Sequence, residues 1–226
     1  NVVASYADGE VSDPNDDRSV LTTFALNEQG WILNRPSLIQ SRDQEGNVVS
    51  QRRLYYDDAS SAETAPRKGH ITKEEEWLDR DRTGPVERWI PTTMSYDAYG
   101  NVAALIDALG HTVTNTYDSE RHTFLVRVAN SLGHTRNMVY DPRFGHVISA
   151  TDANGVTTST EYDTLGRVTK IIGPLDSPDL PTTRYEYDLS SNPVRVTQYT
   201  RVQRGLAKEL VAHTFTDGLG RTIQTR

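Results

Sequence analysis

The chain has 226 residues, of which 35% are apolar, with a mean hydropathy of −0.62, a net charge of −7 and no cysteine. The negative charge argues against a nucleic-acid or anionic-membrane partner, because both need a basic face. No segment approaches the ~18–20 consecutive apolar residues of a membrane span, and the lack of cysteine excludes disulfides and thiolate metal sites.

The first 92 residues carry irregular signs of β-structure. Residues 1–20 are polar, and we expect an irregular lead-in there. Residues 21–92 contain degenerate β repeats, which include two loose copies of a turn formula in which Gly follows Asp or Asn three positions later. Residues 58–70 have the composition of a surface loop. Residues 71–78 fit a strand better than a short helical turn, which the run Glu74–Glu76 would also favour.

Residues 93–226 form a regular array with a period of about 22 residues. The dipeptide Tyr-Asp recurs with its tyrosines 21, 23, 22 and 25 residues apart, at Tyr96, Tyr117, Tyr140, Tyr162 and Tyr187. A fixed period of this size predicts a repeat architecture. The proline-rich segment 173–181 breaks the period and is expected to be a long connection between strands. A new strand begins after the turn at Asp217, so we expect the chain to be a piece of a longer polypeptide.

The turn formula has a physical explanation. An Asp or Asn at the first position can accept hydrogen bonds from backbone N–H groups two and three residues on. Gly at the fourth position can adopt the left-handed conformation that closes a hairpin loop with a bulge. The flanking segments alternate and are rich in Thr, Val and Tyr, which predicts strands. The copies are Asn27/Gly30, Asp43/Gly46, Asp97/Gly100, Asp107/Gly110, Asn130/Gly133, Asp152/Gly155, Asp163/Gly166 and Asp217/Gly220. Each repeat is therefore two antiparallel strands and two tight turns.

The segments 96–102, 162–168 and 217–222 resemble the Tyr-Asp ("YD") repeat of the Rhs family, and 108–112 and 131–135 resemble its intervening turns. The arrangement is similar to the middle of the B-type subunit of bacterial insecticidal toxin complexes and to related secreted Rhs proteins. The resemblance implies an all-β fold of tandem antiparallel hairpins, in a curved spiral sheet that is part of a hollow shell. Its self-cleaving aspartate region has no counterpart here, so no catalytic residue is carried over.

Three groups of side chains invite a metal or catalytic interpretation. The in-phase aspartates Asp97, Asp118, Asp141, Asp163 and Asp188 stand ~9–10 Å apart if one whole repeat separates them. Ligands of one calcium ion are at most ~5 Å apart, so we expect these residues to cap turns instead. The same argument disfavours zinc at His111, His134 and His146. Glu74, Glu75, Glu76, Asp79 and Asp81 alternate with basic residues and are expected to form a solvated charged face rather than an acid/base pair. We expect no catalytic residue, cofactor or metal.

The Tyr-Asp tyrosines could form an aromatic sugar-binding surface, but we expect their rings to pack on neighbouring strands with wet hydroxyls. The sequence thus predicts a non-enzymatic wall segment of a secreted bacterial Rhs shell. The resemblance implies that this shell encloses a C-terminal toxin or effector, and the expected partners are the rest of the shell, the enclosed polypeptide and other toxin-complex subunits. An extracellular adhesion or carbohydrate-binding array is the alternative.

Overall fold

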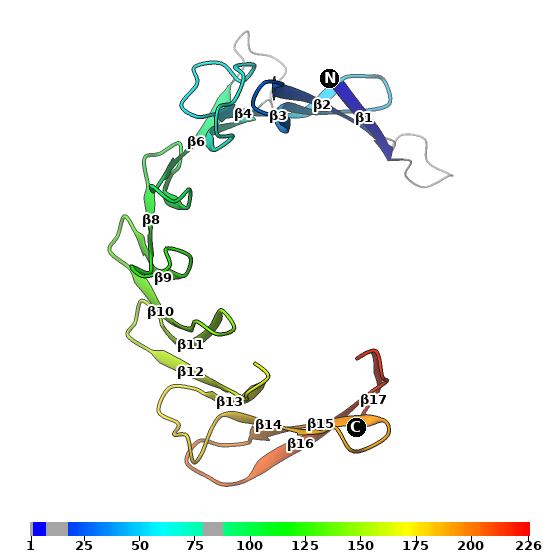
Figure 1. The fold of residues 1–226 in the computed structure, drawn as a ribbon, viewed down its shortest axis with the longest axis vertical. Coiled ribbons are helices and arrows are strands. Elements are labelled where there is room, and N and C mark those ends of the chain that lie inside the picture. The colour runs from blue at the N-terminus through cyan, green and yellow to red at the C-terminus, as the bar shows by residue number, and fades with distance from the viewer. Residues whose placement is uncertain (1, 8–17, 79–87) are drawn as a thin grey trace. The chain divides into compact units, whose positions relative to one another are not determined.

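The computed structural model describes residues 2–7, 18–78 and 88–226, and every regular element in these ranges is a β-strand (Figure 1). The strands are β1 (Val2–Ala7), β2 (Arg18–Asn27), β3 (Ile32–Arg42), β4 (Val48–Tyr56), β5 (Ile71–Trp77), β6 (Trp89–Tyr96), β7 (Val102–Ile106), β8 (Thr112–Tyr117), β9 (Leu125–Asn130), β10 (Thr135–Asp141), β11 (His146–Thr151), β12 (Thr157–Tyr162), β13 (Val168–Ile172), β14 (Thr183–Asp188), β15 (Val194–Arg201), β16 (Glu209–Thr216) and β17 (Thr222–Thr225). The described part of the chain therefore offers no helix that could cross a membrane. The predicted all-β class is confirmed.

The strands form hairpins between sequence neighbours. Each of the strands β1 to β7 pairs antiparallel with the next, and so does each of the strands β9 to β16. Most connections are short turns, which leave no room for a crossover of a dozen or more residues, and across the longer 58–70 connection β4 still pairs antiparallel with β5. The register shifts by a bulge at Tyr56, Tyr96, Tyr140 and Tyr162, each the last or next-to-last residue of its strand. The predicted hairpins with bulged turns are thus confirmed.

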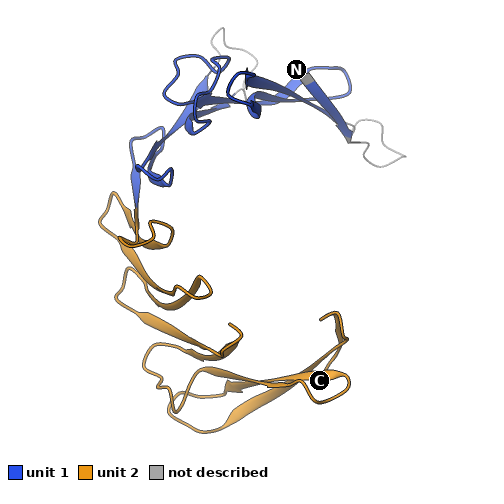
Figure 2. Ribbon diagram, viewed as in Figure 1, with its two compact units in different colours: residues 1–115 blue, residues 116–226 orange. Residues whose placement is uncertain are grey.

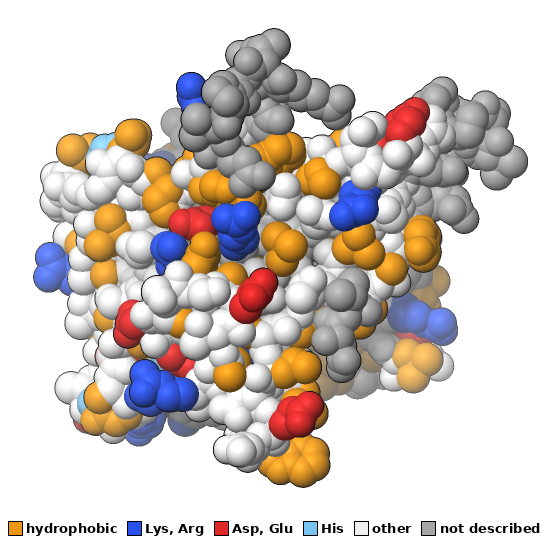
Figure 3. All heavy atoms as spheres, turned by 90° about the horizontal axis from the view of Figure 1, so that it is seen from above, with side chains coloured by type: hydrophobic (Ala, Val, Ile, Leu, Met, Phe, Trp, Pro, Cys, Tyr) orange, Lys and Arg blue, Asp and Glu red, His pale blue; other side chains and the backbone are white. Residues whose placement is uncertain are grey.

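The chain divides into two compact units, residues 1–115 and 116–226 (Figure 2). The first unit holds a small core of Ala25, Leu54 and Tyr56, against which Ile39 and Ile71 pack. In the second unit the buried residues are Pro181 and two polar ones, Thr183 and Thr197. Apolar side chains lie among charges of both signs on the face drawn in Figure 3. Few side chains are fully buried, which accords with the low apolar content.

The described residues among the first 92 are more regular than the sequence predicts. β1 lies inside the stretch 1–20 that was expected to be an irregular lead-in, because Val2–Ala7 pairs in register with Arg18–Thr23 of β2. Residues 71–77 form β5, so the strand interpretation is confirmed over the helical one. Residues 58–70 contain no strand and connect β4 to β5, and residues 173–181 lie between β13 and β14.

Candidate functional site: the Tyr-Asp turns

The turn formula produces the same hydrogen-bond pattern at most of its copies. At Asp97, one carboxylate oxygen accepts the backbone N–H groups of Tyr99 and Asn101, each at 2.9 Å. The Gly100 N–H donates to the Asp97 carbonyl at 3.2 Å. The pattern recurs at Asp107, Asn130, Asp152, Asp163 and Asp217. The side chain thus caps N–H groups two and four residues on, whereas the sequence analysis expected two and three.

The glycine of the formula adopts a left-handed conformation at seven of the eight copies. Gly155, for example, has φ +76°. The copy at Asn27 differs, because the left-handed residue there is Trp31 with φ 55°. Asn27 Oδ1 instead accepts the Gly30 N–H at 2.8 Å, while Asn27 Nδ2 donates to the Pro66 carbonyl. A bond to the distant 58–70 loop therefore accompanies a change in the local turn geometry.

Four of the five tyrosines of the Tyr-Asp motif pack on side chains of the preceding motif. The partner in each case is the residue with which the chain leaves the preceding Tyr-Asp turn. The ring centroids are 4.5 Å apart for His70 and Tyr96, 5.0 Å for Phe124 and Tyr140, and 4.9 Å for His146 and Tyr162. Arg167 replaces the ring in the next copy, with its guanidinium carbon 4.3 Å from the ring centre of Tyr187. Each of these four tyrosines therefore links its turn to the preceding one by a π contact.

The tyrosine hydroxyls also donate hydrogen bonds to backbone carbonyls. Each of three donates to the carbonyl of the residue that follows its stacking partner: Tyr96 to Ile71 at 2.8 Å, Tyr162 to Val147 at 3.0 Å and Tyr187 to Val168 at 2.8 Å. Tyr56 donates to the Pro36 carbonyl at 2.7 Å, and burial raises the pKa of its hydroxyl to about 12. The expectation that these rings pack on neighbouring strands is confirmed, but the expectation of wet hydroxyls is wrong for these residues. The hydroxyls satisfy carbonyls near the bulges.

Asp57 organises the 58–70 loop. One of its carboxylate oxygens accepts the N–H groups of Arg67, Lys68 and Gly69 at 2.6, 2.8 and 3.0 Å, and the other accepts that of His70 at 3.1 Å. Burial by itself would raise the pKa of Asp57, but the four backbone bonds outweigh it and lower the pKa to about 2. The 58–70 segment, which was predicted as a surface loop, is therefore held by hydrogen bonds to the Asp57 carboxylate, much as each short turn is held by its own Asp or Asn side chain.

Two clefts lie beside Tyr-Asp turns. The one in the first unit has a volume of about 640 Å³ and is lined by residues that include Asp57, Lys68, His70 and Tyr96. A general base needs a pKa near the working pH. Asp57 fails this requirement, because its pKa is about 2 and its oxygens are engaged by backbone donors. The cleft in the second unit, of about 590 Å³, is lined by side chains that include Phe124, Met138 and Tyr140.

The candidate metal ligands stay at separate turns. Among the described residues, no three His, Asp or Glu side chains gather closely enough to hold a metal ion. The His111 ring bonds its own turn residue Asp107 at 2.8 Å, and His146 stacks on Tyr162. The aspartates expected to cap turns do so. The carboxylates of Asp118 and Asp141, for example, accept turn N–H groups. The Phe124 N–H is the main cause that lowers the pKa of Asp118 to about 2. The Arg143 side chain is the main cause that lowers the pKa of Asp141 to about 2.

The acidic run at Glu74–Glu76 is more structured than a solvated face. Glu75 accepts the Tyr55 hydroxyl at 2.6 Å and pairs with Lys73 at 3.0 Å. Glu74 pairs with Arg52 at 3.1 Å. Glu74 and Glu75 are register-paired with adjacent residues of β4, so they lie on opposite faces and do not form an acid/base pair. Asp79 and Asp81 lie outside the described residues.

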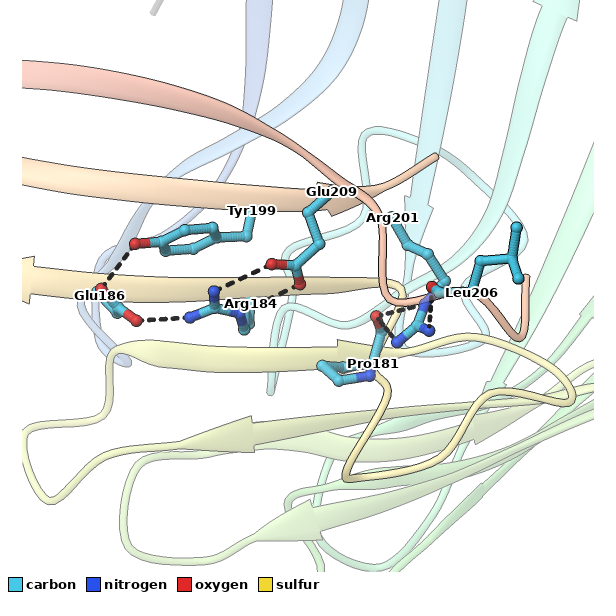
Figure 4. Close-up of polar contacts among 7 residues, drawn as sticks. All are labelled: Pro181, Arg184, Glu186, Tyr199, Arg201, Leu206 and Glu209. Carbon is cyan, nitrogen blue, oxygen red and sulfur yellow. Dashed lines mark hydrogen bonds and ion pairs between the residues drawn. The ribbon is translucent and has the colours of Figure 1, made fainter. Parts of the chain in front are cut away.

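A second polar cluster was not predicted from the sequence. Arg184 of β14 binds Glu209 of β16 at 3.0 Å and also contacts Glu186, and its guanidinium carbon lies 3.4 Å from the ring centre of Tyr199 (Figure 4). The hydrogen bonds to Glu209 raise the pKa of Arg184. Nearby, Arg201 donates to the carbonyls of Pro181 and Leu206. These residues belong to no motif, because only strand register brings them together.

The repeated turns and stacked tyrosines correspond to a known sequence family. Residues 140–177 match the family model described as RHS Repeat. The chain carries an RHS repeat. That segment spans the Tyr140 and Tyr162 motifs and the start of the proline-rich connection, so the resemblance stated from the motifs is confirmed. No curated protein sequence matches the chain.

Solved structures share the fold of this RHS-repeat chain. A crystal structure of TcdB2-TccC3 is 14% identical with a TM-score of 0.68, and the match covers 93% of this chain and 15% of that one. The Tc holotoxin pore of Photorhabdus luminescens with the TccC3 mutation D651A is 13% identical, with a TM-score of 0.66 and coverages of 94% and 17%. TcdB2-TccC3 without its hypervariable C-terminal region is 16% identical, with a TM-score of 0.52 and coverages of 91% and 12%. The chain thus spans less than a fifth of these proteins.

Proposed function

We propose that this chain is a structural wall segment of an Rhs/YD-repeat shell, curved into part of a hollow enclosure around the C-terminal toxin or effector of a secreted bacterial toxin. The observation that carries the proposal is the fold similarity to TcdB2-TccC3 over 93% of the chain, together with the RHS repeat at residues 140–177. The chain itself would act sterically, not as an enzyme.

The internal construction of each unit supports a wall. Strands pair only with their sequence neighbours within a unit, so the described residues of each unit form a single layer with no second sheet packed on it. The Asp-capped turns and the tyrosine contacts between successive turns stiffen such a layer without a thick core. Repeat arrays of this kind extend by adding units, because each unit needs only its neighbours.

The partners follow from the proposal. They are the remainder of the same shell, the enclosed C-terminal polypeptide and other toxin-complex subunits; the similar structures contain TcdB2 with TccC3, and one of them also contains Cdc42. The proposed location is extracellular. No nucleic-acid partner is proposed, because the net charge is −7.

Limited proteolysis of the full-length parent protein tests the proposal. We expect its C-terminal region to resist protease, and we expect the double variant Tyr162→Ala and Tyr187→Ala to expose that region, because both tyrosines link successive turns. Tyr6→Ala is the control, since this tyrosine is 79% exposed. Equal digestion of the C-terminal region in wild type and double variant, or specific binding of the parent protein to a glycan array with an unprotected C-terminal region, would contradict enclosure.

A further inference from the structure

The two faces of the sheet in the second unit differ in charge. Strand register places Tyr185, Gln198 and Ala212 on one face and Arg184, Tyr199 and Val211 on the other. We name these the neutral face and the charged face of β12–β17. At the strand positions that share the neutral face, the side chains are Thr, Tyr, Val, Ile, Leu, Ala and Gln, with no Asp, Glu, Lys or Arg. Each strand from β12 to β16 places at least one charged side chain on the charged face.

The charged face is internally neutralised. Lys170 pairs with Glu161 at 3.2 Å, Arg184 with Glu209 at 3.0 Å and Arg195 with Asp188 at 3.1 Å. All three pairs join different strands of the sheet. Opposite charges across strands stabilise a sheet and remain compatible with water. The charges on this face therefore pair with one another across strands, and the strand positions of the other face carry no charge. A turn residue, Arg167, does lie against Tyr187 on that other face, where it is paired with Asp163.

The neutral face is not covered by a second sheet of its own unit, since the strands there pair only with their neighbours along the sheet, although Thr183 on this face is buried. Leu210 on this face is 65% exposed. The Thr and Tyr hydroxyls and the Gln amides of the neutral face can both donate and accept hydrogen bonds. A fixed charge on the face would instead attract partner groups of one charge and repel those of the other. Such a face can contact polypeptide of almost any sequence with little electrostatic selection.

We infer that the neutral face of β12–β17 is the side of the wall that contacts the enclosed polypeptide, while the charged face lies toward water. This inference rests on the proposed enclosing function. The occupant is a polypeptide of variable sequence, because the C-terminal region of the structurally similar TcdB2-TccC3 is described as hypervariable. A wall that must accept changing sequences cannot match each one with a fixed charge pattern, and burying an unmatched charge against a passenger is costly.

Site-specific photocrosslinking in the full-length parent protein tests the inference. Leu210 and Val211 are adjacent, 65% and 51% exposed, and on opposite faces. We replace each in turn with p-benzoylphenylalanine, irradiate the intact protein and identify crosslinked peptides by mass spectrometry. Thr158 and Thr157, which are adjacent on β12, form a second pair with the same relation to the two faces. We expect crosslinks to the C-terminal polypeptide from positions 210 and 158 and no such crosslinks from positions 211 and 157.

The protease resistance of the C-terminal region is measured on the same samples, so that the two proposals can fail separately. A protected C-terminal region that crosslinks from 211 and 157, from both faces, or from neither face overturns the inference and leaves enclosure standing. A C-terminal region that is digested as fast as an unfolded control overturns both.

Discussion

At the scale of single residues, this chain repeatedly closes its turns on a carboxylate. Asp57 is the most extensive example, since its two oxygens accept four backbone N–H groups from residues 67–70. Hydrogen bonds to a charged acceptor each contribute ~1.5–3 kcal/mol when well formed. Asp57 also holds a left-handed conformation at φ 54°. The loop therefore depends on one side chain for both its backbone shape and its donors.

Replacing Asp57 by Ala should lower the free energy of unfolding by about 2–4 kcal/mol, because four backbone donors lose their acceptor and Ala disfavours the left-handed conformation. Asp57→Asn should cost less, since the amide keeps one acceptor oxygen and Asn tolerates the backbone angle. Urea denaturation of the three proteins measures the difference. If Asp57→Ala lowered the free energy of unfolding less than Asp57→Asn does, the anchoring role would be refuted.

The same carboxylate predicts a pH dependence. The pKa of Asp57 is about 2 in the folded chain and about 3.9 in an unfolded one. A group with a depressed folded pKa stabilises the fold above its unfolded pKa and loses that contribution as pH falls through the folded value. Wild-type stability should therefore decline from about pH 4 toward pH 2, with a shallower decline in Asp57→Ala. Parallel declines, measured by denaturation at each pH, would rule out this contribution.

The turn glycines give a second prediction at this scale. Gly155 has φ +76°, and a Cβ added there would meet nothing within 4 Å. Gly155→Ala should therefore destabilise through backbone strain alone, by about 1–2 kcal/mol. Gly218 is the matched control, because an added Cβ also meets nothing there and its φ lies outside the left-handed region. Thermal unfolding of Gly218→Ala should stay close to wild type, and an equal loss in both variants would point away from φ as the cause.

At the scale of the element, the unit of construction is a pair of successive Tyr-Asp turns. The tyrosine of one turn stacks on a side chain of the previous turn and donates to the next carbonyl along that strand, as Tyr162 does with His146 and Val147. The contact ties together two hairpins that would otherwise share only a strand ladder. It also occupies a carbonyl beside a bulge, where the ladder is locally disrupted.

Removing only the hydroxyl tests this link. Tyr162→Phe should lower the free energy of unfolding by about 0.5–1.5 kcal/mol, because the Val147 carbonyl loses its donor while the ring contact remains. Tyr162→Ala should cost more, since the stack on His146 disappears too. Tyr6→Phe serves as the control, and urea denaturation is the measurement. A Tyr162→Phe variant as stable as wild type would mean that the hydroxyl bond has no net value.

At the scale of the whole molecule, the pattern of contacts is nearest-neighbour. Within each compact unit, strands pair only with the strands beside them in sequence. Stability in such an array is approximately a sum of unit and interface contributions. Damage at one turn should therefore remain local, in contrast to a globular domain with one shared core.

Hydrogen exchange of Tyr187→Ala provides the check at this scale. The variant removes the contacts of this residue with Arg167 and Val168, so protection should fall in β13, β14 and β15. Protection in β2 and β3 should remain at its wild-type level. A uniform loss of protection across the described strands would show that the chain unfolds as one cooperative body.

The sequence by itself determined the elements of this chain, because turn formation is local chemistry. Asp97 and Gly100 lie in one tetrapeptide, and their hydrogen bonds and left-handed φ could be anticipated from that spacing. The period of Tyr-Asp likewise predicted hairpins and the RHS repeat. The exception at Asn27 arises where a bond to Pro66, 39 residues away, coincides with a departure from the local turn rule.

Only the tertiary structure decided which side chains meet across strands. Arg184 and Glu209 are 25 residues apart, and their contact depends on the register of three strands. Bulges shift that register, and each one-residue shift moves side chains to the other face. For this reason the acceptors of the tyrosine hydroxyls and the sorting of charge onto one face of β12–β17 could not be deduced from spacing along the chain.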